Sequence, residues 1–256
     1  MLQVKTLSTL FYKDDSIIKA VDDFSFYIEK GETLGLLGES GSGKSTVALS
    51  ILRLISKPGK IVSGAIELDG QDILKLSDKE IINIRGAKLS MIFQDPFSSL
   101  NPVFTIGDQI AETISLHQKL SKKESWRKAK EMLQKVQIDP DRIRNYPHQF
   151  SGGMRQRVMI AMALSCQPEF LIADEPTTAL DVTIQEGVLK LIKDLQRELG
   201  FGMIFITHNF RIAKKVCDRF CVMQKGKLVE EGSQVFNKPQ KPYTKKLVDC
   251  MNLLYA

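Results

Sequence analysis

The feature that most constrains this chain is a glycine-rich loop between an apolar run and a segment with helical spacing. Thr33 to Leu37 is a short apolar run of the kind that forms a buried parallel strand, and Ser45 to Leu54 has helical spacing. Between them, Gly38-Glu-Ser-Gly-Ser-Gly-Lys-Ser45 matches the pattern GxxxxGK[ST]. Glycines let the backbone wrap around phosphate groups, so that successive N–H groups and a helix N-terminus face negative charge. The segment therefore predicts a nucleotide-phosphate site.

Two side chains of this loop have distinct expected roles. The Lys44 ammonium would reach the β and γ phosphate oxygens, and the Ser45 hydroxyl would ligate Mg²⁺. The alternative is a glycine-rich turn that binds nothing. The strand expected before the loop and the helix expected after it favour the nucleotide site over that alternative.

Elsewhere in the chain, short apolar runs alternate with helical patterns. Val21 to Ile28 is rich in strand-forming residues, and Ile66 to Gly70 reads as a strand that ends in an Asp-Gly turn. Phe170 to Ala173 and Met203 to Ile206 are two further strand candidates, separated by the helical segment Thr183 to Leu199. Alternation of this kind predicts an α/β fold with a doubly wound sheet.

A helical insertion is expected between Thr105 and about Leu164. Apolar residues repeat there at helical spacing among many lysines and glutamates, which predicts helices with one polar face. The repeating residues are Ile106, Ile110, Ile114, Ala129, Leu133 and Val136. The tail after Phe236, rich in lysine and proline, is expected to form a peripheral surface helix.

Composition excludes several classes of protein. Hydrophobic residues make up 43% of the 256 residues and charged residues 26%, which supports a globular core and excludes disordered and fibrous chains. The longest apolar run, Val158 to Cys166, is about half the length that a membrane-spanning helix needs. The N-terminus lacks the basic-then-apolar pattern of a signal peptide. We therefore expect a cytosolic protein that does not itself cross a membrane.

The charge of the chain leaves several partners open. A formal net charge of +6 is compatible with nucleotide, nucleic acid or a membrane surface, and charge alone does not choose among them. The four cysteines form no CxxC pair, so we expect free thiols rather than a metal or iron–sulfur site.

A second chemical motif follows the strand candidate Phe170 to Ala173. Asp174 and Glu175 come directly after it. A strand-end aspartate can hold Mg²⁺ through water, and a following glutamate can orient or deprotonate an attacking water. A solvated acidic pair at a strand end is an equally good interpretation of these two residues taken alone.

Two weaker motifs flank this acidic pair. Ser151-Gly-Gly before a long helix forms an anion cradle at a helix N-terminus, although a plain helix-capping turn is the default interpretation. Thr207-His208 follows a strand, where a lone histidine is more often structural than catalytic. The order of the motifs along the chain favours the functional interpretation of each of them. The order is the phosphate loop, Gln94 after an apolar strand, Ser-Gly-Gly, Asp-Glu and then His.

This ordered set resembles the nucleotide-binding subunit of ABC transporters along nearly the whole chain. The resemblance implies an α/β fold with a P-loop NTPase (RecA-like) core, an N-terminal antiparallel β subdomain and a helical subdomain that carries the signature. It implies an ABC ATPase domain over residues 1–236, with the helical subdomain inserted at about 96–165, and a short C-terminal tail over 237–256.

The resemblance also implies roles for individual residues. Glu175 would be the catalytic carboxylate, His208 the switch histidine and Gln94 the Q-loop glutamine, while Asp181 would belong to the D-loop. Phe11 fits best as the aromatic that stacks on adenine, with Tyr12 as its rival. The remaining ATP-binding residues would be Gly38, Glu39, Ser40, Gly41, Ser42, Gly43, Lys44, Ser45 and Thr46, and the Mg²⁺ ligands Ser45, Gln94 and Asp174.

The signature segment departs slightly from the family's common form. It has Phe150 where leucine is usual and Met154 where glutamine is usual, but the serine and both glycines that face phosphate are intact. The residues implied to contact the ATP of a partner cassette are Ser151, Gly152, Gly153, Met154 and Gln156.

Three segments, at 93–102, 149–157 and 177–185, are similar to the peptide/nickel import ATPases, and Lys241-Pro-Tyr-Thr244 resembles the C-terminal motif of that group. The chain would thus be the ATP-hydrolysing subunit of an ABC importer for peptides or for nickel or a metallophore. Members for di- and oligopeptides usually carry a longer C-terminal extension. The short tail here favours the nickel or metallophore branch, or a shortened peptide importer.

In such importers two ATPase subunits enclose two ATP molecules head to tail. We expect a second, different ATPase subunit rather than a homodimer. Two transmembrane permease subunits would dock on the loop after Gln94 and on the helical insertion, with an extracellular substrate-binding protein as an indirect partner. The chain would lie peripherally on the cytoplasmic face of the membrane and would not bind nucleic acid.

Two other functions compete with this one. The first is a soluble ABC ATPase that acts on nucleic acid or ribosomes, which the basic charge permits. A single cassette without long coiled-coil heptads disfavours it. The second is a regulatory cassette that binds nucleotide without hydrolysing it, which the intact Glu175 and His208 disfavour.

Overall fold

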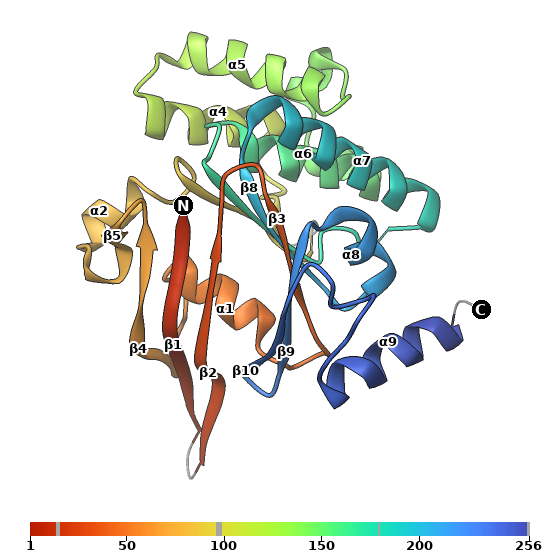
Figure 1. Ribbon diagram of the computed structural model, residues 1–256. Helices are drawn as coiled ribbons and strands as arrows, with labels where there is room; N and C mark the ends of the chain where they lie inside the picture. The colour runs from red at the N-terminus through yellow and green to blue at the C-terminus, as the bar shows by residue number, and fades with distance from the viewer. Residues whose placement is uncertain (14–15, 96–98, 179, 255–256) are drawn as a thin grey trace. The chain divides into compact units, whose positions relative to one another are not determined.

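The computed structural model describes residues 1–13, 16–95, 99–178 and 180–254 (Figure 1). The chain forms two compact units. The first combines Met1–Ser77 with Gly202–Ala256, and the second is Asp78–Phe201.

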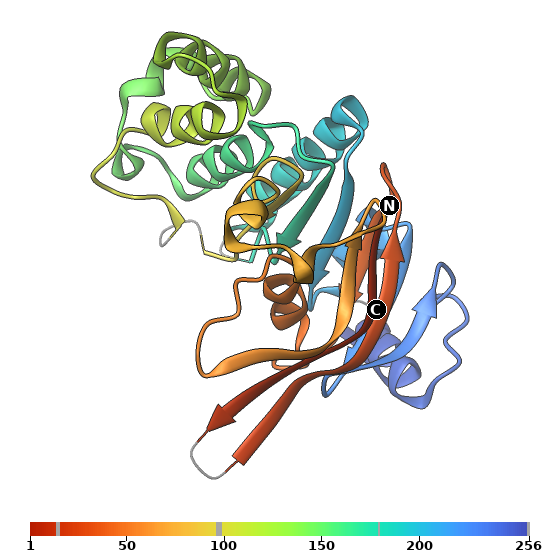
Figure 2. The same cartoon turned by 90° about the vertical axis from the view of Figure 1, so that its left-hand side faces the viewer.

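The first unit begins with an antiparallel sheet in the order β2-β1-β4-β5. Its strands are β1 (Leu2–Lys13), β2 (Ser16–Ile28), β4 (Gly59–Leu68) and β5 (Gln71–Asp72). The long β1–β2 pairing runs from Leu2 opposite Ile28 to Lys13 opposite Ser16 (Figure 2). The turn after β4 has Asp69 and Gly70 at φ 49° and 84°, the positive values that a tight two-residue hairpin turn requires. The Asp-Gly turn predicted there is confirmed.

The same unit contains a mostly parallel set of strands in the order β10-β9-β3-β8. These are β3 (Thr33–Leu37), β8 (Gly202–Thr207), β9 (Arg219–Gln224) and β10 (Lys227–Gly232). Strand β3 pairs in parallel with β8 and β9, and all five of its residues are buried. A continuous apolar run suits a strand covered on both faces, which is why the sequence located it correctly.

Helices of the first unit are α1 (Lys44–Ile51), α8 (Phe210–Val216) and α9 (Pro242–Leu254), with a 3₁₀ turn, η1, at Ile73–Lys75. The tail is therefore helical, as predicted. Helix α1 ends earlier than the spacing predicted, because Arg53 adopts a left-handed φ of 51° and donates 2.6 Å to the carbonyl oxygen of Leu76. The β9–β10 hairpin and α8 were not predicted from the sequence.

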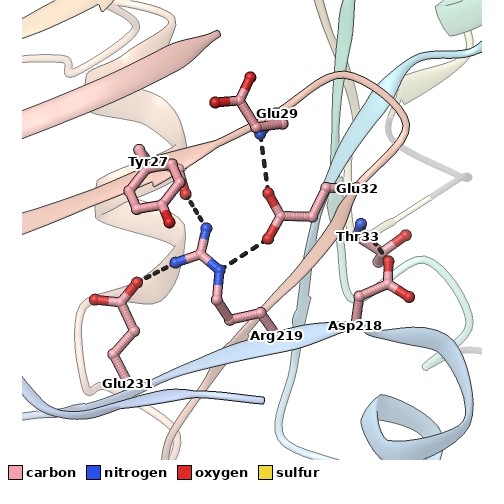
Figure 3. Close-up of polar contacts among 7 residues, drawn as sticks. All are labelled: Tyr27, Glu29, Glu32, Thr33, Asp218, Arg219 and Glu231. Atoms are coloured by element: carbon pink, nitrogen blue, oxygen red, sulfur yellow. Dashed lines mark hydrogen bonds and ion pairs between the residues drawn. The ribbon is translucent and has the colours of Figure 1, made fainter.

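Arg219 joins several strands of the first unit (Figure 3). Its guanidinium Nε donates to Glu32 at 2.8 Å, and its other nitrogens reach the Glu231 carboxylate and the carbonyl oxygen of Tyr27. The guanidinium also lies 4.3 Å from the centroid of the Tyr27 ring. Beside it, the Asp218 carboxylate accepts from the backbone N–H of Thr33 at 2.8 Å. These contacts tie the end of β2 and the start of β3 to β9 and β10.

The second unit contains a parallel strand pair, β6 (Leu89–Ile92) with β7 (Phe170–Asp174). Its helices are α2 (Asp78–Ile82), α4 (Ile106–Gln118), α5 (Lys122–Lys135), α6 (Gly152–Leu164) and α7 (Val182–Leu199), with 3₁₀ turns η2 (Pro140–Arg144) and η3 (Pro147–Gln149). Ser121 and Glu124 form a capping box that starts α5. All six apolar residues that set the predicted helical spacing are buried, which confirms the pattern.

Within the part of the chain that the structure describes, none of the helices combines the length and the apolar character that crossing a membrane requires.

Candidate nucleotide-binding site

The phosphate loop runs from the end of β3 to the start of α1, where the sequence placed it. Its glycines are required by the geometry at two positions. Gly38 has φ 153°, and a Cβ there would lie 2.2 Å from the carbonyl oxygen of Met223. Gly43 has φ 109°, and a Cβ there would lie 2.1 Å from the carbonyl oxygen of Ala20. Any side chain at these positions would displace the loop from the strands beneath it.

Lys44 is enclosed by the loop that it follows. Its side chain is buried, with the residue only 6% exposed, and its ammonium donates to the carbonyl oxygens of Gly38 at 2.9 Å and Glu39 at 2.8 Å. Gly43 occupies the N-cap of α1 and offers no side chain to cover the first N–H groups of the helix. Backbone donors, a helix N-terminus and one ammonium therefore converge at this loop, which is an arrangement that binds phosphate.

The hydroxyl-bearing residues of the loop differ in exposure. Ser40 and Ser45 are exposed, Thr46 is half-buried, and Ser42 is buried. The Ser42 backbone N–H donates to the carbonyl oxygen of Glu39 at 3.2 Å. Ser45 is thus accessible at the surface of the loop.

The two aromatic candidates for adenine stacking lie at the end of β1. The Phe11 ring is half-buried and lies over the backbone of Gly59 on β4, whereas Tyr12 is 45% exposed. That Phe11 stacks on adenine, with Tyr12 as its rival, stays a prediction.

In the second unit, Gln94 and Glu175 come together although 81 residues separate them. The Gln94 side-chain amide donates to Glu175 Oε2 at 3.1 Å, and the hydroxyl of Thr178 donates to the same oxygen at 3.0 Å. Glu175 has a left-handed φ of 45°, a conformation that costs a non-glycine residue on the order of 1–3 kcal/mol. The two hydrogen bonds hold the carboxylate just past the buried Asp174 at the end of β7. Sequence reasoning found Gln94 and Glu175 but missed Thr178.

Ser151 forms the N-cap of α6, and its hydroxyl accepts from the backbone N–H of Met154 at 3.4 Å. A Cβ on Gly153 would lie 2.5 Å from Ile184 Cγ2 on α7, so close packing requires glycine there. Ser151 is exposed, but Gln156 is only 1% exposed and faces the interior of the second unit. The structure therefore does not present Gln156 on the same surface as Ser151.

The remaining predicted residues lie at helix starts. Asp181 forms the N-cap of α7 and accepts from the backbone N–H of Ile184 at 2.9 Å. His208 is exposed between β8 and α8. Asn209 accepts from the N–H groups of Arg211 and Ile212 and so fixes the start of α8 immediately after the histidine.

A groove of 680 Å³ lies on helices α4 and α5 of the second unit, and we call it the α4–α5 groove. Its lining mixes exposed apolar side chains such as Phe104 and Leu116 with the carboxylates of Asp108 and Glu112. The full lining is Phe104, Asp108, Gln109, Ala111, Glu112, Ser115, Leu116, Lys122, Ser125 and Trp126. Over the residues described, there is no group of three or more His, Cys, Asp or Glu that could hold a metal ion by itself.

Comparison with known proteins relates this geometry to one family. The family model for the ABC transporter matches residues 21–178. A probable peptide ABC transporter ATP-binding protein, y4tR of Sinorhizobium fredii, is 49% identical over 256 residues, which cover 98% of this chain and 76% of that protein. The glutathione import ATP-binding protein GsiA of Shigella dysenteriae is 50% identical over 266 residues, and the chain spans only 43% of its length.

Among solved structures, the ATP-binding cassette MJ0796, determined as a dimer in a post-hydrolysis state bound to ADP and Pi, superposes with a TM-score of 0.81. It is 29% identical in sequence, and the superposition covers 94% of this chain and all of that one.

Proposed function

The chain belongs to the ABC transporter family, as an ATPase of that family, and on this premise we propose that it powers the import of peptides across the cytoplasmic membrane. The observation that carries the proposal is the 49% identity to a probable peptide ABC transporter ATP-binding protein over 98% of the chain. A second relative, which is 50% identical, is a glutathione import ATP-binding protein. Neither of these relatives is named for nickel or a metallophore, so of the cargoes expected from the sequence we propose peptides.

The proposed ATP-binding step uses the phosphate loop. Lys44 would exchange the carbonyl oxygens of Gly38 and Glu39 for the β and γ phosphate oxygens, and the N–H groups at the start of α1 would bind the same anion. Because the carbonyls already hold the ammonium in place, little side-chain freedom is lost on binding.

The proposed metal is Mg²⁺, with Ser45, Gln94 and Asp174 as its protein donors. A hydroxyl, an amide oxygen and a carboxylate are the hard oxygen ligands that Mg²⁺ takes, and phosphate oxygens and water would complete its octahedron. When bound, the ion would neutralise the negative charge that develops on the phosphates.

The proposed hydrolytic step uses Glu175 to orient and deprotonate water, with Gln94 and Thr178 fixing its carboxylate. His208 would contact the γ-phosphate. The exposed Ser151, with Gly152 and Gly153, would contact the ATP of a second cassette. Hydrolysis would therefore need a dimer, because an isolated half-site leaves the γ-phosphate without some of its donors. We propose that the second cassette is a different ATPase subunit, which would make the dimer a heterodimer.

We propose that the α4–α5 groove receives a short helix of a transmembrane permease subunit. Its exposed Phe104 and Leu116 offer apolar contact, and Asp108 and Glu112 would orient a basic helix. The groove lies within the helical subdomain proposed at about 96–165, inserted in the domain 1–236. This docking would place the chain on the cytoplasmic face of the membrane, with two permeases and an extracellular binding protein in the complex.

The proposal is tested by trapping the complex. A tagged Glu175→Gln chain, expressed in its own host with ATP and Mg²⁺, should recover two permeases and a second ATPase from membranes. Glu131→Gln, an exposed change on α5, is the matched control and should recover less of the closed complex. Reconstituted vesicles should then show ATP-dependent uptake of short peptides. Recovery of ribosomes or nucleic acid from the soluble fraction instead would contradict the importer, and uptake of nickel alone would contradict the peptide cargo.

A further inference from the structure

The segment before Ser151 is held by the guanidinium group of Arg142, which lies on η2. Its Nη2 donates to the carbonyl oxygen of Gln149 at 2.8 Å, and its Cζ lies 4.3 Å from the centroid of the Phe150 ring. Phe150 is buried, so the guanidinium rests on a fixed aromatic face. Arg142 therefore contacts both of the residues that precede Ser151 in the chain.

The same guanidinium also reaches the other side of Ser151. Nη1 of Arg142 lies 3.5 Å from the sulfur of Met154, on the first turn of α6. The backbone N–H of Met154 is the group that donates to the Ser151 hydroxyl. One cation thus bridges the residues before and after Ser151. Phe150 and Met154, which it contacts, are the two positions at which the signature segment departs from the family's common form.

A second guanidinium, that of Arg155 on α6, holds the same stretch of backbone. Its Nε donates to the carbonyl oxygens of Pro147 at 2.9 Å and Phe150 at 3.0 Å. The carbonyl groups of Gln149 and Phe150 thus each accept from a charged donor, and such bonds are stronger than those between neutral groups. Because a carbonyl group fixes the plane of its peptide, these bonds determine how the chain enters Ser151.

Ser151 is exposed at the N-cap of α6. Its hydroxyl oxygen accepts from the Met154 N–H, and its O–H can still donate to a phosphate oxygen. A donor that is already in place binds more tightly, because ordering a loop on binding costs free energy. The contacts of Arg142 supply that order on both sides of the serine.

We propose that Arg142 is a positioning residue of the signature segment. Its guanidinium holds the residues on both sides of Ser151 in one arrangement, so that the Ser151 hydroxyl and the first N–H groups of α6 are presented to the ATP of a second cassette. This inference rests on the proposed contact of Ser151 with that ATP. Without the guanidinium the segment spends part of its time in other conformations, and the apparent affinity for ATP falls with the populated fraction.

The test compares Arg142→Met with Arg144→Met in the assembled complex. Both residues lie on η2, and both changes replace a guanidinium by an unbranched apolar chain, but Arg144 is exposed. The KM for ATP should rise about 3- to 10-fold in Arg142→Met, the range that one net hydrogen bond produces, and stay unchanged in Arg144→Met. The kcat should match wild type, because excess ATP shifts the whole population to the competent conformation. A lower kcat at unchanged KM, or equal effects of the two changes, would overturn the positioning role.

Calorimetric titration of the full chain by itself separates this effect from misfolding. The phosphate loop lies in the first unit and Arg142 in the second. The Arg142→Met chain should therefore bind ATP and Mg²⁺ with the Kd and the stoichiometry of wild type. A lower stoichiometry would show that the fold is damaged generally, which would overturn a local role of Arg142.

Phe150→Leu tests whether Arg142 acts through the signature segment. Leucine keeps an apolar side chain but removes the aromatic face on which the guanidinium rests. Arg142→Met should therefore raise the KM for ATP less in the Phe150→Leu background than in wild type, which a double-mutant cycle measures. Equal increases of KM in the two backgrounds would mean that Arg142 does not act through Phe150, and the inference would be overturned.

Ser151→Ala separates failure of this inference from failure of the proposed site. If Ser151→Ala raises the KM for ATP and Arg142→Met does not, the role of Arg142 is overturned and the proposed contact with the ATP of a second cassette stands. If neither change raises KM, the proposed contact is itself wrong, and the inference fails with it.

Discussion

The side-chain amide of Gln94 donates a 3.1 Å hydrogen bond to the carboxylate of Glu175. Gln94 follows β6 and Glu175 follows β7, and these two strands are parallel neighbours. Parallel pairing brings the carboxyl ends of strands to one edge of a sheet, which is where α/β proteins bind their ligands. The pairing of the strands therefore explains why two residues far apart in the sequence meet.

Glu175→Gln should keep ATP binding and lower ATP turnover in the assembled complex by about 10²- to 10⁴-fold, the usual contribution of a positioned general base. The amide keeps the size of the side chain but accepts no proton from water. Phosphate release and calorimetric titration measure the two quantities separately. Turnover near that of wild type would remove Glu175 from the catalytic role.

Thr178→Val should lower turnover by about 3- to 10-fold while the KM for ATP stays constant, since the carboxylate of Glu175 loses one of its two described hydrogen bonds but the phosphate loop is untouched. Thr178→Ser keeps the hydroxyl and should restore the rate. Thr183→Val, on the exposed part of α7, is the matched control. Equal rates for Thr178→Val and Thr178→Ser would mean that the hydroxyl does not position Glu175.

Arg219→Met should lower the free energy of unfolding by about 2–4 kcal/mol, because Glu32 and Glu231 lose their shared cation in a largely buried place. Urea denaturation measures this change. The exposed pair of Arg127 with Glu131 on α5 provides the comparison, and Arg127→Met should cost less than about 1 kcal/mol. Similar losses of unfolding free energy in the two variants would mean that the contacts of Arg219 stabilise the protein no more than an exposed ion pair does.

The Glu230 carboxylate on β10 accepts hydrogen bonds from the backbone N–H groups of Gln240 and Lys241, just before α9, and this attachment should weaken in acid. The pKa of Glu230 is lowered in the folded protein, so its ionised form stabilises the fold at neutral pH. That contribution is fully present above the usual carboxyl pKa of about 4.5 and is lost as the pH falls through the lower folded value. The protection factors of the α9 amides, which correct the exchange rates for the intrinsic pH dependence of amide exchange, should fall between about pH 5 and about pH 3 in wild type.

Glu230→Gln provides the control for this acid effect. Without the titrating carboxylate, the α9 amides should have lower protection factors at neutral pH, and the further fall of these factors in acid should shrink. An identical pH dependence in the variant and in wild type would assign the effect to other carboxylates.

Some elements were predictable because their signals are local. Strand β3 is a continuous apolar run, and α4 and α5 carry apolar residues at helical spacing, so burial alone specifies each of them. The β9–β10 hairpin has a Lys225-Gly226 turn, with φ 46° and 83°, in place of a stronger Asn-Gly signal. That hairpin depends on its pairing with β3, which no local pattern reveals.

The sequence by itself determined the phosphate loop, because its glycines and its lysine act through the backbone conformation of adjacent residues. It also placed Glu175 directly after a buried strand and therefore at the edge of the sheet, whereas the catalytic role of Glu175 is implied by the family resemblance and stays a proposal. Only the tertiary structure decided that Thr178 shares the carboxylate of Glu175 with Gln94 and that Gln156 faces the interior. The physical reason is that these outcomes depend on which distant segments pack together, and packing is a property of the whole chain.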